Sequence, residues 1–246
     1  MTQSRFAERH PFWFVAILEV MVILVYLALG TIAHFTNLSN VGLEGLANLV
    51  LTIIAVILLS VMGWWSIVGF RPPDQPADLL YFVVPFLPAV VSLLAGVELK
   101  NVLVVTQLLI ITLMVGFAEE AIFRGLMLNA LKSRGTWTAV IVTSLLFGLS
   151  HSLNVLSGKN LADVLVQILY ALAIGFAFAA LVLKKGIIWP LVLAHFLIDF
   201  TAMIGRTDFS PVLNSILGVA INFVLGSYGL LVMLQKPNVK VMPVMS

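Results

Sequence analysis

The chain contains 246 residues, of which 61% are hydrophobic and only 10% are charged. An average soluble domain is about 25% charged, so this composition excludes an ordinary soluble globular protein and, more firmly, a disordered chain. Because one membrane-spanning helix needs about 20 apolar residues, the chain is long enough for about eight spans with their loops. The sequence has no cysteine, which excludes disulfides, thiolate nucleophiles and cysteine-based zinc sites. The formal net charge of +2 is too small to indicate nucleic-acid binding.

Apolar stretches follow one another along the chain, separated by short polar, charged or proline-containing breaks. Continuous apolar runs of this length are typical of membrane helices, since barrel strands alternate over about ten residues. We therefore expect an all-α polytopic membrane protein of about eight transmembrane helices around a polar intramembrane cavity, with residues 1–246 forming one domain. The predicted stretches are Phe12–Ala33, Leu46–Phe70, Leu79–Val97, Val102–Leu131, Thr136–Leu153, Ala162–Leu183, Ile187–Ile204 and Pro211–Leu234.

Lysine and arginine predict the orientation of these spans, because they gather in cytoplasmic loops. With the amino terminus in the cytoplasm, nine basic residues fall on the cytoplasmic side and three on the opposite side. This ratio predicts that both termini are cytoplasmic. The short chain is typical of a prokaryotic protein, so we expect it in the prokaryotic cell (inner) membrane. The nine are Arg5, Arg9, Arg71, Lys132, Arg134, Lys184, Lys185, Lys236 and Lys240, and the three are Lys100, Lys159 and Arg206.

Ionisable side chains within the predicted spans are candidate functional residues, because each costs about 2.5–3.5 kcal/mol inside a bilayer. In the first stretch, Glu19 argues against a cleaved signal peptide, and we interpret it as structural. The full set is Glu19, Glu119, Glu120, Arg124, His151, His195 and Asp199.

The fourth stretch contains two adjacent carboxylates, which point about 100° apart on a helix. Glu120 and Arg124 are four residues apart, in the favourable order for an ion pair. Glu119 has no such partner, so the two carboxylates are expected to do different jobs.

The fifth and seventh stretches each carry a histidine. Phe147 and His151 share one helix face, and a lone histidine there is more often a hydrogen-bonded packing residue than a ligand. His195 and Asp199 lie one turn apart; such a pair either orients an imidazole, binds a metal or relays protons, or forms only an interhelical hydrogen bond.

Together these groups are typical of a hydrolytic site, because glutamate and histidine are general bases and histidine and aspartate are zinc ligands. A carboxylate beside a water, held by imidazoles or by a metal on imidazoles, is sufficient for hydrolysis. The motifs HExxH, GxSxG and Walker A do not occur in the sequence, which excludes the familiar soluble hydrolase patterns.

The three segments resemble the motifs of the CPBP family of intramembrane proteases, which includes type II CAAX prenyl endopeptidases and bacteriocin-processing or self-immunity (Abi-type) proteins. The family pattern is EExxxR, then FxxxH, then HxxxN or HxxxD. Here the pattern is matched, within a motif-bearing core of about residues 102–204, by Glu119, Glu120, Arg124, Phe147, His151, His195 and Asp199.

The resemblance implies hydrolysis of a peptide bond in a membrane cavity. It implies that Glu119 and His151 activate the attacking water, that His195 and Asp199 stabilise the oxyanion, and that Glu120 supports the site through Arg124. An ionised aspartate only accepts hydrogen bonds, so Asp199 is expected to orient His195 instead. The cofactor is either none or zinc: Glu119, His151 and His195 could supply three ligands, and we favour the metal-free glutamate mechanism.

The expected substrate is a membrane-associated protein or peptide, which is either prenylated or a peptide precursor. The lipid bilayer is the other expected partner. Two alternatives remain open from the sequence. One is a non-catalytic membrane scaffold or regulator on the same fold, and the other is a small proton-coupled transporter, although no inverted repeat supports the latter.

Overall fold

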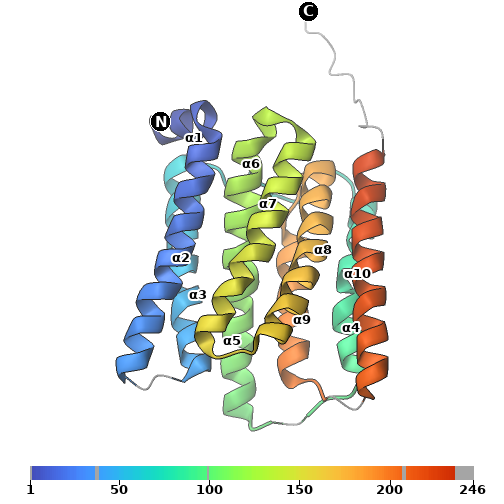
Figure 1. Ribbon diagram of the computed structural model, residues 1–246. Helices are drawn as coiled ribbons and strands as arrows, with labels where there is room; N and C mark the ends of the chain where they lie inside the picture. The colour runs from blue at the N-terminus through green and yellow to red at the C-terminus, as the bar shows by residue number, and fades with distance from the viewer. Residues whose placement is uncertain (1, 37–38, 99, 207–208, 236–246) are drawn as a thin grey trace, which may run out of the picture.

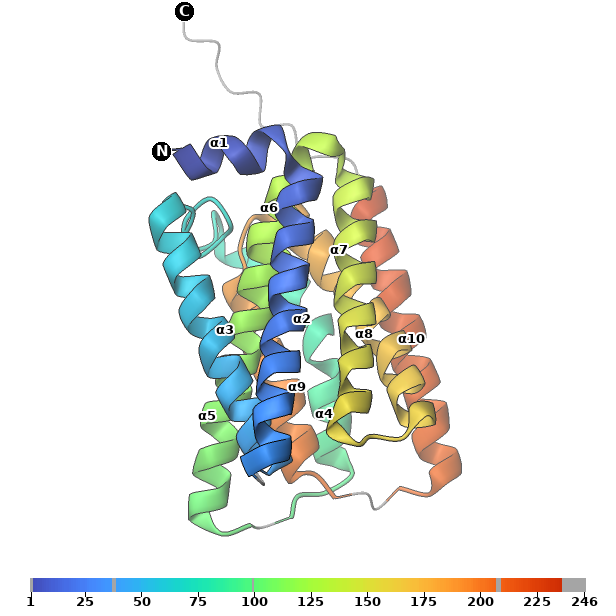
Figure 2. The same ribbon diagram turned by 60° about the vertical axis from the view of Figure 1, so that its left-hand side comes forward.

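The computed structural model describes residues 2–36, 39–98, 100–206 and 209–235. These residues form a bundle of roughly parallel and antiparallel helices, with the short helix α1 lying across one end (Figures 1 and 2). No strand occurs in the described parts of the chain, and one isolated bridge pairs Val97 with Gly205. The expected all-α fold is therefore confirmed.

The helical elements are bounded as follows. The α-helices are α1 (Thr2–Arg9), α2 (Pro11–Thr36), α3 (Asn40–Met62), α4 (Leu87–Leu94), α5 (Val102–Glu119), α6 (Leu128–Leu131), α7 (Thr136–Ser150), α8 (Leu161–Lys185), α9 (Trp189–Ile204) and α10 (Pro211–Leu234). The shorter segments are η1 (Pro76–Phe82), η2 (Val84–Phe86), η4 (Lys132–Arg134) and η5 (His151–Ser157), which are 3₁₀-helical, and η3 (Glu120–Met127), which is π-helical.

Helix α3 differs from the predicted stretch Leu46–Phe70 at both ends. It begins earlier because Ser39 caps it: the Ser39 hydroxyl accepts a hydrogen bond from the backbone N–H of Gly42 at 3.1 Å. It ends earlier because Gly63 adopts a left-handed conformation, with φ of 67°, which terminates an α-helix. The early start brings Glu44, assigned to a loop by the sequence, into the helix.

The third predicted stretch, Leu79–Val97, is not one continuous helix. It is divided into η1, η2 and α4, and its two halves are bent by 41°. Prolines at 76, 85 and 88 begin these segments, and proline cannot donate the backbone hydrogen bond that continues a helix.

The predicted count of eight spans is not confirmed. Among the described residues, six helices are long and apolar enough to cross a membrane, or up to seven if the bent pair counts as one span. Helix α9 is apolar but only 16 residues long. The six are Pro11–Thr36, Val41–Met62, Val102–Arg134, Thr136–Val155, Leu161–Lys185 and Pro211–Leu234.

Large apolar side chains cover the outside of the bundle. Trp13, Leu94 and Phe223 are each at least 70% exposed, although water would disfavour such contact. The charged pair Glu120 and Arg124, in contrast, is buried. This distribution suits a protein whose surroundings are lipid.

The two ends of the bundle differ in charge. We call one the α1 end, because α1, η4 and the last turn of α10 lie there (Figures 1 and 2). Contacts join further segments at this end: Arg71 Nε donates to the Gly186 carbonyl at 3.0 Å, and Lys185 Nζ forms an ion pair with Asp78 at 2.8 Å. The opposite end, where η5 and the start of α5 lie, is called the η5 end.

The predicted basic residues divide between these ends as the sequence suggested. The α1 end carries Arg5, Arg9, Arg71, Lys132, Arg134, Lys184 and Lys185, whereas the η5 end carries Lys100, Lys159 and Arg206. Lys236 and Lys240 lie outside the described residues. Which end faces the cytoplasm stays a prediction.

Candidate active site

The fourth span changes geometry at its two carboxylates. Glu119 is the last residue of α5, and Glu120 is the first residue of the π-helical segment η3. Short π-helical segments of this kind occur frequently at functional sites. All eight residues of η3 are buried, so the segment is fixed by packing on every side.

Glu120 and Arg124 form the ion pair that their spacing predicts. Arg124 Nη1 donates to Glu120 Oε1 at 3.0 Å, and both side chains are at most 1% exposed. The guanidinium also stacks on Phe147, with Cζ 3.9 Å from the ring centroid, and a desolvated cation–π contact of this kind is worth about 2 kcal/mol. Phe147 thus acts on the site through Arg124.

His195 hydrogen-bonds to the same carboxylate oxygen. Its Nδ1 lies 2.8 Å from Glu120 Oε1, so the ring N–H donates to Glu120. Asp199 is farther away, with Oδ2 3.5 Å from His195 Nε2. Glu120, from the adjacent helix, is therefore the nearer partner of the ring, and that Asp199 helps to orient His195 stays a prediction.

Glu119 faces the other side of the His195 ring. Glu119 Oε2 lies 3.5 Å from His195 Nε2 and has no hydrogen-bond partner among the described residues. Nε2 is therefore flanked by two carboxylates, those of Glu119 and Asp199. The adjacent glutamates make different contacts: Glu120 binds Arg124 and His195 through hydrogen bonds, whereas Glu119 has only the ion-pair contact of its Oε2 with His195.

A glycine brings these two helices close enough for the contacts. A Cβ atom on Gly116 would lie 2.9 Å from the backbone nitrogen of Phe196 and 3.0 Å from the carbonyl oxygen of Val192. Small residues permit such close approach of helix backbones in membranes. Gly116 precedes Glu119 by about one turn, so this contact sets the distance between the carboxylates on α5 and η3 and His195 on α9.

His151 reaches the site from the end of α7. Its Nδ1 lies 2.8 Å from the carbonyl oxygen of Phe147, which cannot donate, so Nδ1 carries a proton; when the ring is neutral, Nε2 is an acceptor. The Phe147 ring packs edge-on against His151, with centroids 4.9 Å apart. One phenylalanine thus contacts both Arg124 and His151.

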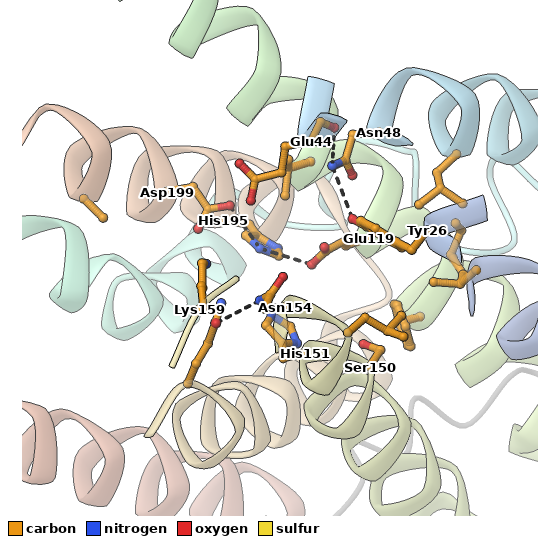
Figure 3. A pocket seen from close by; sticks show the side chains of 18 of the residues that line it. Tyr26, Glu44, Asn48, Glu119, Ser150, His151, Asn154, Lys159, His195 and Asp199 are labelled. Carbon is orange, nitrogen blue, oxygen red and sulfur yellow. Dashed lines mark hydrogen bonds and ion pairs between the residues drawn. The ribbon is translucent and has the colours of Figure 1, made fainter. Parts of the chain in front are cut away.

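A cavity of about 300 Å³ joins these side chains (Figure 3). Glu119, His151, His195 and Asp199 all line it. The Phe147 ring contacts both histidines, with centroids 4.9 Å from His151 and 6.0 Å from His195, so His151 joins the site although it comes from the end of a different helix. From Glu119 the cavity extends along the bundle toward the η5 end.

Other polar residues of the cavity were not identified from the sequence. They come from α2, α3, η5, the segment before α8, and α8 itself: Tyr26, Glu44, Asn48, Asn154, Lys159 and Gln167. The Ser39 cap was the signal that would have placed Glu44 in a span. No sequence feature predicted that Lys159 lines the cavity, because its position depends on how the chain returns from η5 to α8.

Three of the predicted ionisable residues do not line this cavity. Glu120 and Arg124 still belong to the site through their ion pair and the contact of Glu120 with His195, whereas no such contact joins Glu19 to the site among the described residues. Glu19 lies in α2. Its Oε2 is buried and has no hydrogen-bond partner among the described residues. Its assignment as a structural residue therefore stays a prediction.

The three suggested zinc ligands do not form a metal-binding group in this arrangement. Among the described residues, no cluster of three or more His, Cys, Asp or Glu side chains could hold a metal ion. Both nitrogens of His195 already face carboxylates, and His151 Nδ1 faces a carbonyl. No catalytic step is therefore assigned to a metal here.

A bundle with apolar spans that buries carboxylates and histidines around a cavity has the architecture of an integral membrane protein with a polar interior site. Residues 101–201 match the family described as Type II CAAX prenyl endopeptidase Rce1-like. The match confirms the family resemblance drawn from the three motifs, covers all seven motif residues, and supports an enzyme because this is a protease family. No curated protein and no solved structure is similar enough to the chain to count as a match.

Proposed function

We propose that this protein is an intramembrane endopeptidase that hydrolyses a peptide bond of a membrane-associated polypeptide with a water activated by Glu119. The observation that carries the proposal is the carboxylate of Glu119: it lines the polar cavity, and its buried Oε2 has an ion-pair contact with His195 Nε2 at 3.5 Å but no hydrogen bond among the described residues. A general base must offer a lone pair to the water it deprotonates. Glu119 meets this requirement, whereas Glu120 is already bound to Arg124 and His195.

His151 supports Glu119 in this proposal. Because its Nδ1–H donates to the Phe147 carbonyl, its Nε2 is free to accept a hydrogen bond from the same water. A water that donates its two hydrogens to these two acceptors has a fixed orientation, and its oxygen lone pairs remain available for attack on the peptide carbonyl. The proton passes to the Glu119 carboxylate and from there to the departing amine.

His195 is the proposed oxyanion donor. Glu120 holds its ring through Nδ1, so Nε2 points to the space between Glu119 and Asp199. When Nε2 carries a proton, it can donate a hydrogen bond to the developing oxyanion. Such stabilisation of the oxyanion contributes strongly to the rate of peptide hydrolysis. Asp199 only accepts when ionised, so its role is to hold this proton rather than to touch the oxyanion.

The test is a comparison of membrane peptides from cells that produce the wild-type protein or Glu119→Gln. Peptides that depend on the wild-type site should disappear with Glu119→Gln, because glutamine cannot accept the proton of water. The matched control is Glu19→Gln, which changes a carboxylate in α2 that does not line the cavity.

The control should leave the peptides unchanged. If Glu119→Gln yields the wild-type peptides, or restores the phenotype of a strain lacking the gene, the endopeptidase proposal fails and a non-catalytic scaffold role replaces it.

A further inference from the structure

The cavity that holds Glu119 extends toward one end of the bundle only. Its lining comes from the second half of α2, the first turns of α3, the segment that precedes α8 and the last turn of α9, represented by Tyr26, Glu44, Lys159 and Met203. All four parts lie at the η5 end (Figures 1 and 2). The 3₁₀ geometry of η5 agrees with this, because non-α backbone at membrane depth is tolerated where it borders a cavity.

Toward the α1 end the same site is closed by packed side chains. Leu126, Met127 and Leu131 continue the helix beyond Glu120 and are fully buried, and Phe178 and Leu181 of α8 are fully buried as well. Interiors of this kind are packed to the density of organic crystals, so a polypeptide chain cannot pass through them. Access to Glu119 is therefore from the η5 end.

Charge assigns the two ends to the two sides of the membrane. Seven basic residues of the described chain lie at the α1 end and three at the η5 end. Cytoplasmic loops carry the excess of lysine and arginine. The α1 end is therefore the cytoplasmic end, and the η5 end, with the cavity mouth, faces outward.

We infer that the active-site cavity opens to the extracytoplasmic side, and that the substrates are polypeptide segments presented to the membrane from that side. This inference rests on the proposed endopeptidase function for its substrate class, and on cavity geometry and charge alone for its direction. A polypeptide exposed only in the cytoplasm would meet the packed α1 end and would not reach Glu119. Segments next to the membrane anchor of a translocated protein, or precursors released on the outer face, have the required access.

The absence of cysteine from the sequence makes the direction directly measurable. A single cysteine is introduced as Lys159→Cys at the cavity mouth or as Ser133→Cys in η4 at the α1 end, where the serine is exposed. Cells that produce each full-length variant are treated with a membrane-impermeant maleimide, before and after permeabilisation. Lys100→Cys, at the η5 end but outside the cavity lining, reports the same side if Lys159→Cys does not accumulate.

The expected result is labelling of Lys159→Cys and Lys100→Cys in intact cells, with Ser133→Cys labelled only after permeabilisation. Labelling of Ser133→Cys in intact cells, or labelling at the η5 end only after permeabilisation, overturns the inference. Labelling does not require catalysis, so this failure is distinguishable from failure of the endopeptidase proposal, which appears as unchanged peptides in Glu119→Gln cells.

The substrate class has its own readout. The Glu119-dependent peptides are expected to derive from extracytoplasmic or membrane-embedded segments of their parent proteins. Peptides cut solely from cytoplasmic segments would overturn the inferred access while leaving the endopeptidase proposal intact.

Discussion

A single buried carboxylate organises the charged residues of the site. Glu120 Oε1 accepts from Arg124 at 3.0 Å and lies 2.8 Å from His195 Nδ1. Burying a charge without a partner costs several kcal/mol, so each of these three groups depends on the others. Glu119, one residue earlier, meets this network only through the 3.5 Å contact with His195 and is the proposed general base.

Replacing Arg124 by methionine is expected to destabilise the protein by about 3–5 kcal/mol, because it leaves Glu120 buried with its countercharge removed. Thermal unfolding in detergent measures the loss. In the double variant Glu120→Met/Arg124→Met, much of the stability should return, since no unpaired charge remains. Activity should stay low, since His195 loses its nearest hydrogen-bond partner. Equal stability of wild type and Arg124→Met would contradict the proposed network.

Replacing His151 by glutamine is expected to lower the cleavage rate by about 10²–10⁴-fold, the usual contribution of a positioned acid–base group. The fold should persist, because the side chain lies at the end of α7 and faces the cavity. The measurement is the initial rate of peptide release by purified protein. The matched control is His34→Gln on the exposed face of α2. A similar loss of cleavage rate in both variants would contradict the catalytic role of His151.

At the scale of helices, the site depends on how closely α5 approaches α9. The contact at Gly116 allows Glu119 and Glu120 to reach His195 from a neighbouring helix. The π-helical turn that follows shifts the register of the span at the carboxylates themselves. Helix packing and backbone geometry therefore bring together groups that are about 75 residues apart in the sequence.

Gly116→Ala is expected to cost about 1–3 kcal/mol of stability, because the added methyl would overlap the α9 backbone and force the helices apart. Cleavage should fall more steeply, since the distance from Glu119 to His195 grows. Gly226→Ala in α10 is the control: a Cβ there meets no atom within 4 Å, and helix propensity favours alanine by about 1 kcal/mol. Unfolding temperature and cleavage rate are measured for both, and parallel effects would show that Gly116 has no special packing role.

At the scale of the whole molecule, an apolar exterior surrounds a polar interior. The exposed large apolar residues extend over α2, α3, α5, α8 and α10, and the ionisable groups of the site face inward. The polar interior is packed shut toward the α1 end and open toward the η5 end. This difference between the two ends is the basis of the inferred extracytoplasmic access.

The apolar exterior has a simple consequence for handling the protein. It is expected to stay in the membrane fraction after washing with alkaline carbonate and to dissolve only with detergent, because lipid contact replaces water around the exposed apolar residues. Immunoblotting of the two fractions measures this. Release by carbonate alone would contradict the assignment of six or more spans.

The sequence by itself determined the all-α membrane class and the residues of the three motifs, because apolar runs and intramembrane charges are local signals. It also predicted the Glu120–Arg124 pair, which depends only on helix periodicity. It did not determine the break of the third stretch, where prolines interrupt an otherwise apolar run, or the early start of α3 that makes Glu44 part of a span.

Only the tertiary structure decided which groups meet. Glu120 rather than Asp199 holds His195 most closely, and Lys159 joins the cavity, because both depend on packing between helices distant in the chain. The direction in which the cavity opens is likewise a property of the folded bundle, since it depends on which half packs densely and which half leaves space. Local periodicity carries no information about these long-range contacts, and this is why the residues of the candidate site could be predicted from the sequence while its geometry could not.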